Sequence, residues 1–270
     1  MIHFQEPERK HGTGDEAELT YFGSSAFRIT APSGLTIMID PWRNHPAGTL
    51  NWYYREFCEA AVDIGVSTHA HFDHDALHRL DSNMLIDRLV GRFELADVRI
   101  IGVADKHVHV SQHSLYDWAR LTEERTGLKL SPPNNPRSFD NSIVLVETAG
   151  LRILHWGDNR PDPPLSVWEA LGDIDVALLP VDQSQHILSY SQADSIAERL
   201  GARIIVPHHY FVWNLTQRCS TLLPVEEWVN RHERVTRTQS ASYKLVRERV
   251  KAMSPTILFF GEHVALDPNT

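Results

Sequence analysis

The stretch Thr68-His69-Ala70-His71-Phe72-Asp73-His74 places three imidazoles and one carboxylate within six residues. Imidazole and carboxylate groups are ligands that suit zinc and its neighbours among the transition metals. Residues two apart in an extended or turning chain project to the same side, so His69 and His71 can reach one ion. Asp73 and His74 then point round the turn toward a second ion. The alternative is a solvated loop in which three histidines lie close together by chance. Their spacing and their position after a strand argue against it.

The apolar run from Val62 to Thr68 predicts a buried strand that delivers this cluster. Three further strand candidates precede it and are separated by turn-like Gly, Ser and Pro residues. These candidates are Glu18 to Phe22, Ala26 to Thr30 and Leu35 to Asp40. The short breaks between them predict an antiparallel meander.

After the cluster, strand and helix patterns alternate. Strands are predicted at Val98 to Val103, Asn141 to Glu147, Leu151 to His155, Asp175 to Pro180, Ala202 to Pro207 and Thr256 to Phe260. Helices are predicted to start at Asp75 to Leu80 and to cover Ser114 to Thr126, Gln192 to Leu200, Val225 to His232 and Ser242 to Val250. Hairpins followed by alternation indicate stacked sheets with helices outside, a layered α/β domain. A doubly wound parallel sheet is the alternative, but two antiparallel pairs and the lack of a Gly-rich phosphate turn weigh against it.

The length of 270 residues predicts a single domain spanning 1–270. Within it, residues 1–15 are expected to form a polar arm. Residues 211–270 are expected to form a C-terminal extension of helices and a strand that completes the domain.

The net charge of −9 argues against nucleic-acid binding and against binding to anionic membranes, since both need basic surface. The two cysteines are scarce and far apart, which suits a reducing compartment. No apolar run approaches membrane-spanning length, and the N-terminus carries no signal-like pattern. We therefore expect a cytoplasmic protein whose partner is a small-molecule substrate.

Further candidate ligands follow other strands, where a rigid scaffold gives way to loop. A centre with two metals needs about six or seven such donors. We expect one ion to be held by His69, His71 and His107, and the other by Asp73, His74 and His209, with Asp158 bridging.

Two of these assignments have competitors nearby. His109 and His113 compete with His107, which we favour because it lies closer to its strand. His208 competes with His209, and we expect His208 to support a ligand rather than to bind metal. The segment between His107 and Asn141 is long enough to build a lid or a homo-oligomer contact.

Three more residues are candidates for supporting or catalytic roles. Asp40 ends a strand and is expected to orient a ligand histidine, because such carboxylates fix the imidazole tautomer. Asp182 and His186 follow the strand that ends at Pro180, where they could support a ligand or contact substrate. Their alternative is an ordinary polar loop.

From Leu19 to Tyr210 the chain resembles the metallo-β-lactamase-fold hydrolases, and it is most similar to the branch that contains ascorbate phosphate lactonase. The pieces that carry the resemblance run in the family's order: Tyr21-Phe22-Gly23, Ile39-Asp40-Pro41, the His69 cluster, Ile101-Gly102-Val103 leading to His107, Trp156-Gly157-Asp158, Leu178-Leu179-Pro180 and Pro207-His208-His209-Tyr210. The resemblance implies a four-layer αββα sandwich of two mixed β-sheets, with the site at one edge of both. One departure is Ser24, where this branch often has a histidine.

The expected activity is hydrolysis without a serine or cysteine nucleophile. Two cations about 3.5–4 Å apart would trap a hydroxide between them, and that hydroxide would attack a lactone or ester carbonyl. Asp73 would aim the hydroxide, and Asp73, a metal-bound water or His186 could protonate the leaving group. The expected cofactors are two divalent ions, with zinc first and manganese or iron as alternatives. A small or cyclic phosphodiesterase and a non-catalytic metal- or ligand-binding module are the competing functions.

Overall fold

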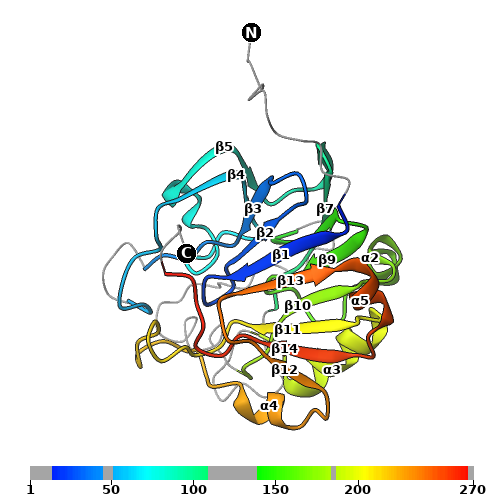
Figure 1. The fold of residues 1–270 in the computed structure, drawn as a ribbon. Helices are drawn as coiled ribbons and strands as arrows, with labels where there is room; N and C mark the ends of the chain where they lie inside the picture. The colour runs from blue at the N-terminus through cyan, green and yellow to red at the C-terminus, as the bar shows by residue number, and fades with distance from the viewer. Residues whose placement is uncertain (1–13, 45–50, 109–138, 184–186, 267–270) are drawn as a thin grey trace.

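The computed structural model describes residues 14–44, 51–108, 139–183 and 187–266, which form two mixed β-sheets that face each other (Figure 1). Both sheets contain parallel as well as antiparallel neighbours. This arrangement confirms the predicted α/β class with two mixed sheets.

The smaller sheet has six strands in the described part of the chain, in the order β13-β1-β2-β3-β4-β5. Its strands are β1 (Glu16–Tyr21), β2 (Phe27–Thr30), β3 (Thr36–Ile39), β4 (Ala60–Ser67), β5 (Leu80–Asp87) and β13 (Ser242–Val246). β1 to β3 are antiparallel, which confirms the meander, and β4 joins β3 in parallel.

The larger sheet has eight described strands in the order β12-β14-β11-β10-β9-β8-β7-β6. Its strands are β6 (Gly91–Leu95), β7 (Val98–Asp105), β8 (Asn141–Thr148), β9 (Leu151–His155), β10 (Val176–Pro180), β11 (Ile204–His208), β12 (Val235–Arg237) and β14 (Thr256–Phe259). β8 pairs antiparallel with both β7 and β9, whereas β9, β10, β11 and β14 run parallel to one another.

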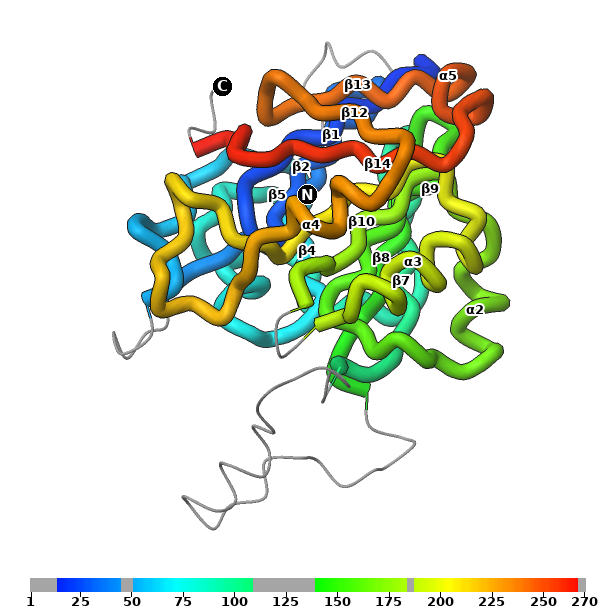
Figure 2. Tube along the Cα trace, turned by 90° about the horizontal axis from the view of Figure 1, so that it is seen from below, coloured from blue at the N-terminus to red at the C-terminus, as the bar shows by residue number. Residues whose placement is uncertain are grey.

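The helices lie outside the two sheets. α2 (Leu165–Leu171) and α3 (Tyr190–Arg199) flank the larger sheet on the side that faces away from β1 to β5 (Figure 2). The 3₁₀ helix η1 (Ala76–Arg79) contacts β4 and β5 of the smaller sheet, and α5 (Arg247–Ala252) contacts β13. The remaining helix is α4 (Glu226–Asn230). None of the helices in the described ranges is long and apolar enough to cross a lipid bilayer.

The core lies between the sheets and takes apolar side chains from both. Leu19 and Phe27 of the smaller sheet and Leu154 and Val206 of the larger sheet are fully buried within it. Burying a side chain of this size stabilises the fold by about 1.5–3 kcal/mol. The packed core holds the strand ends in fixed positions, and the candidate site depends on those positions.

Two sequence predictions were wrong about the elements. Asp75 to Leu80 forms one turn of 3₁₀ helix and then enters β5, a strand the pattern did not indicate. Ser242 to Val250 was predicted as one helix, but its first half is β13, which pairs antiparallel with β1. The helix α5 begins only at Arg247. The predicted helix at Ser114 to Thr126 lies outside the described residues.

Residues 211–266 contribute to both sheets. They supply β13 to the smaller sheet and β12 and β14 to the larger one, so the C-terminal part of the chain is built into the same two layers (Figure 1).

Candidate metal centre

The structure brings the seven predicted donors together as two neighbouring groups. His69, His71 and His107 form one group; Asp73, His74, Asp158 and His209 form the other. In each group the candidate ligand atoms lie within 4.8 Å of one another. The groups form because β4, β7, β9 and β11 all end at the same edge of the two sheets, each just before a donor.

The first group combines two buried histidines with one exposed histidine. His69 Nε2 lies 3.1 Å from His71 Nδ1, and the His107 ring lies 4.8 Å from that of His69 and 4.7 Å from that of His71. His107 is fixed by its Nδ1, which lies 2.5 Å from the carbonyl oxygen of Val108. His71 alone among these donors is exposed, so the site is open to solvent on this side.

The second group is fully buried. His209 Nε2 lies 3.2 Å from Asp73 Oδ2, and His74 Nε2 lies 3.5 Å from the same oxygen. His209 directly follows β11 and adopts a left-handed backbone conformation with a φ of 58°. A non-glycine residue in this region is strained, and such residues concentrate at functional sites.

Asp158 lies between the two groups. Its Oδ2 is 3.5 Å from Nε2 of His74 and of His209, and also 3.5 Å from Nε2 of His107 in the first group. Its distance to His69 Nε2 is 3.9 Å. One carboxylate oxygen therefore faces donors of both groups, the position that a bridging ligand requires.

Asp40 belongs to neither group but contacts one of the candidate donors. Its Oδ2 lies 2.7 Å from Nδ1 of His74, and its two oxygens accept hydrogen bonds from the backbone and hydroxyl of Thr68, each at 2.7 Å. Asp40 itself is fully buried and has a φ of 51°. This contact could orient a candidate ligand, and the orienting role of Asp40 stays a prediction.

A buried polar network that sequence reasoning missed holds the loop of Asp158. Asn159 Nδ2 donates to Asp105 Oδ2 at 2.8 Å, and Asn141 Nδ2 donates to Asn159 Oδ1 at 3.0 Å. Arg160 also pairs with Asp105, at 2.7 Å. The available signal was that these polar residues lie at or shortly after the ends of strands.

Burial and neighbouring charges shift the pKa values of the candidate donors in different directions. Burial and the nearby His74 and His107 hold the pKa of His69 well below its usual range, so its imidazole is neutral. Burial opposes ionisation of Asp158, but the neighbouring His209 and His74 outweigh burial and lower the pKa of Asp158 well below the usual value. Burial likewise opposes a charge on His209, but Asp158 and Asp73 raise its pKa to about 9. A bound cation would replace such protons, because metal and proton compete for the same lone pairs.

The donor set fits divalent metal ions. His74 Nε2 and Asp158 Oδ1 are buried and have no hydrogen-bond partner among the described residues. Buried polar atoms are nearly always paired, so orphaned atoms on facing ligand-type side chains fit the binding of a cation. Nitrogen and carboxylate oxygen together suit zinc, manganese or iron.

Two further residues, His208 and Asp182, were predicted to support a ligand. The His208 ring is fully buried against His155, with ring centroids 4.6 Å apart, and neither ring nitrogen makes a hydrogen bond within the described structure. Asp182 accepts from the backbone of Leu223 at 2.8 Å, so it holds a neighbouring loop. The other predicted residue of this loop, His186, lies outside the described residues, as do His109 and His113, the competitors of His107.

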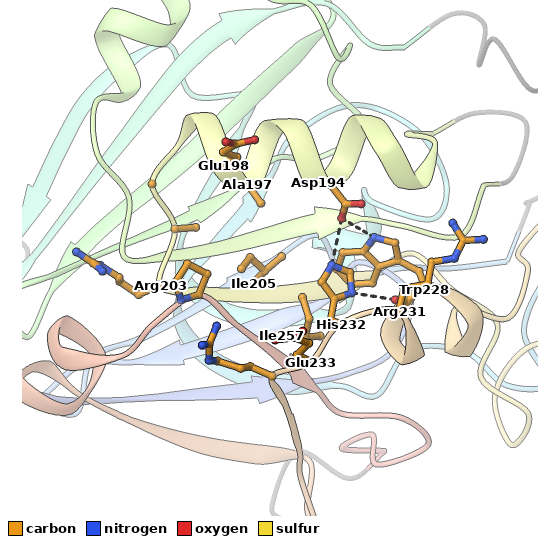
Figure 3. Close-up of a pocket in the computed structure, with 14 residues that line it drawn as sticks. Asp194, Ala197, Glu198, Arg203, Ile205, Trp228, Arg231, His232, Glu233 and Ile257 are labelled. Carbon is orange, nitrogen blue, oxygen red and sulfur yellow. Dashed lines mark hydrogen bonds and ion pairs between the residues drawn. The ribbon is translucent and has the colours of Figure 1, made fainter.

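A cavity of about 630 Å³ lies elsewhere, between α3, α4 and the outer face of the larger sheet (Figure 3). None of its lining residues is a candidate metal donor. Asp194 Oδ1 accepts from Trp228 Nε1 at 2.8 Å and lies 3.3 Å from Nε2 of His232. These contacts join α4 and His232, which follows it, to α3.

Two mixed sheets carrying this donor cluster at one edge define a metal-dependent hydrolase of the metallo-β-lactamase fold. The chain belongs to the beta-lactamase superfamily, because the model of the beta-lactamase superfamily domain matches residues 18–209.

Curated relatives extend over most of the chain. A UPF0173 metal-dependent hydrolase of Myxococcus xanthus is 25% identical over 214 residues, covering 76% of this chain and 74% of its own. One of Ignicoccus hospitalis is 28% identical over 202 residues, covering 72% of this chain and 82% of its own. A crystal structure from Thermotoga maritima, assigned to the metallo-beta-lactamase superfamily, superposes with a TM-score of 0.62 at 21% identity and covers 90% of this chain and 97% of its own. These findings confirm the predicted superfamily, while the ascorbate phosphate lactonase branch stays a prediction.

Proposed function

We propose that the chain hydrolyses a small-molecule lactone or ester at a dinuclear metal centre made by the two donor groups. The observation that supports this most directly is the position of Asp158 Oδ2, within 3.5 Å of histidine nitrogens from both groups. With Asp158 set apart, each group has three other candidate donors. A carboxylate between these two sets of three is suited to join two ions. Zinc is the first expectation for both, with manganese or iron as alternatives.

When bound, the two cations supply Lewis acidity, which acidifies water and polarises the oxygen of a carbonyl. The side chains of the protein would hold the ions and orient the attacking water. His69, His71 and His107 would hold one ion; Asp73, His74 and His209 would hold the other. Asp73 Oδ2 faces the interior of the site, 3.2 Å from His209, where it can accept a hydrogen bond from the attacking water.

Among the candidate donors, one marks a side of the site that is open to solvent. His71 is exposed, whereas Asp73, His74, Asp158 and His209 are buried. The substrate would therefore approach over His71, with its carbonyl directed toward the buried carboxylates. A small molecule fits this access, and the acidic net charge of −9 does not favour nucleic acid.

The test is a rate screen with protein reconstituted with zinc or manganese and checked by elemental analysis. The panel contains γ- and δ-lactones, 4-nitrophenyl acetate and bis(4-nitrophenyl) phosphate. We expect about two metals per chain and turnover of lactone or ester. Turnover of the phosphodiester alone would replace the proposal with a phosphodiesterase, and metal binding with no turnover would favour a ligand-binding module.

The Asp158→Asn variant serves as the loss control, because it removes the charge shared by the two groups. We expect it to bind fewer metals and to lose hydrolysis. Asp173→Asn is the matched control, since Asp173 is exposed and lies outside both groups. Unchanged metal content and rate in Asp158→Asn would contradict the proposal. The cytoplasmic location and a homo-oligomeric state stay predictions from the sequence.

A further inference from the structure

The turn Gly23-Ser24-Ser25 between β1 and β2 lies against the loop that carries His209. The His209 backbone N–H donates to the Ser24 carbonyl oxygen at 2.8 Å. Ser24 has a φ of 50° and His209 a φ of 58°, so two non-glycine residues in the left-handed region are joined by one hydrogen bond. Such conformations persist only where surrounding contacts impose them.

The side chain of Ser24 supplies one of those contacts. Tyr53 Oη donates to Ser24 Oγ at 2.8 Å, and both residues are buried. The Tyr53 ring packs on Trp42 with centroids 4.2 Å apart, and Trp42 Nε1 donates to the Phe22 carbonyl at 2.9 Å. Trp42 thus holds the Tyr53 ring in place, and Trp42 is itself held by the residue before the turn.

Tyr53 also lies near the second donor group. Burial raises the pKa of Tyr53 well above its usual value, and the charges of Asp73 and Asp158 add to the rise. The phenol thus remains protonated and acts as a donor toward Ser24. It makes no hydrogen bond with a candidate metal ligand in the described structure, so any effect on the centre passes through Ser24 and the His209 backbone.

We propose that Tyr53 and Ser24 form a positioning pair that sets where His209 presents Nε2. The pair thereby sets the affinity for the ion held by Asp73, His74, Asp158 and His209. This inference rests on the proposed dinuclear centre and adds to it two residues that bind neither metal nor substrate.

The test compares Tyr53→Phe, Ser24→Ala and the double variant in metal titrations against a chelating dye. Tyr53→Phe keeps the ring on Trp42 and removes only the hydroxyl. We expect roughly a tenfold or larger loss of affinity for one of the two ions, as is typical when a partner behind a ligand is removed. The affinity for the other ion stays unchanged. With cobalt as the probe, the visible absorption bands of one ion should shift.

The double variant shows whether the two residues act together. Because Tyr53 acts through Ser24, the double variant should lose no more than the larger single loss. Tyr190→Phe is the matched control, since Tyr190 is a buried tyrosine that contacts Gln183 and lies outside the donor groups. Thermal unfolding of the metal-free proteins shows whether each variant folds, and Ser24→Ala carries the test if Tyr53→Phe does not.

If the folded variants bind both ions with the affinity of the wild-type chain, or if the two losses are fully additive, this inference is overturned. The proposed function would remain intact. A wild-type chain that binds no metal would instead remove the proposed function itself. The two failures are therefore distinguishable in one titration series.

Discussion

Asp40 Oδ2 lies 2.7 Å from Nδ1 of His74 and accepts the Thr68 hydroxyl at the same distance. Thr68 Oγ1 in turn lies 3.0 Å from Nδ1 of His69. One carboxylate thus contacts a donor of the second group directly and a donor of the first group through Thr68. A proton on Nδ1 of each histidine would suit these contacts and would leave the lone pair of Nε2 for a metal ion.

Asp40→Asn should therefore weaken binding of both ions. The amide can place an N–H group against His74 Nδ1, which moves the imidazole proton to Nε2 and blocks the ligand atom. We expect a roughly 10–100-fold loss of metal affinity, measured by titration, with a parallel loss of hydrolysis. Asp97→Asn is the control, because Asp97 accepts from the Ser33 backbone and lies outside the donor groups. Loss at only one ion would show that Thr68 does not transmit the effect.

Gly157→Ala tests how closely the loop of Asp158 packs on the loop of His69. Gly157 has a φ of 59°, and an added Cβ would lie 2.8 Å from Thr68 Oγ1 and 2.8 Å from Asn141 Oδ1. Both neighbours are fixed by hydrogen bonds, so the loop must shift. We expect reduced metal content by elemental analysis and a lower midpoint of thermal unfolding.

The control for this substitution is Gly201→Ala. Gly201 has a φ of 64° but nothing within 4 Å of an added Cβ, so it reports backbone strain alone, about 1–2 kcal/mol. If both variants keep full metal content and lose equal stability, the close packing at Gly157 does not control the site.

Metal removal should destabilise the protein. The second group buries Asp73, His74, Asp158 and His209 together, and without a cation their charges are balanced only by protons on histidine. Metal present at 100 times its dissociation constant stabilises the native state by about 2.7 kcal/mol per site. We expect chelation to lower the melting temperature by roughly 5–10 °C for each ion removed, as seen by calorimetry, and added zinc to restore it. An unchanged melting temperature in metal-loaded and chelated protein would argue against tight metal sites.

All seven candidate donors could be chosen from the sequence because their spacing and their place after strands are local properties. His69 to His74 follow β4, and Asp158 and His209 follow β9 and β11. The structure adds the distances among them, which depend on how the two sheets face each other. No local pattern carries that information.

The supporting contacts were harder to predict for the same reason. Ser24 and Tyr53 are 29 positions apart and touch through single side-chain atoms. Asn159 and Asp105 are 54 positions apart and are joined by one side-chain hydrogen bond. Neither pair has a motif, because their role follows from packing between distant segments.

The wrong helix at Ser242 to Val250 shows where periodicity misleads. The apolar residues of a short edge strand followed by a short helix mimic one helical stripe, and pairing with β1 decides the outcome. Leu245 lies opposite Ala17 of β1 and is fully buried, whereas the neighbouring Lys244 is exposed and pairs with Glu16 at the surface.

This alternation gives the last prediction. Leu245→Ala should lower the free energy of unfolding by about 2–5 kcal/mol, because it opens a cavity under β13. Lys244→Ala should change it by less than about 1 kcal/mol, since it removes only a surface ion pair. Urea unfolding followed by circular dichroism measures both. If Leu245→Ala costs no more than Lys244→Ala, β13 does not pack on the core, and the C-terminal residues would be an appendage to the smaller sheet instead of one of its strands.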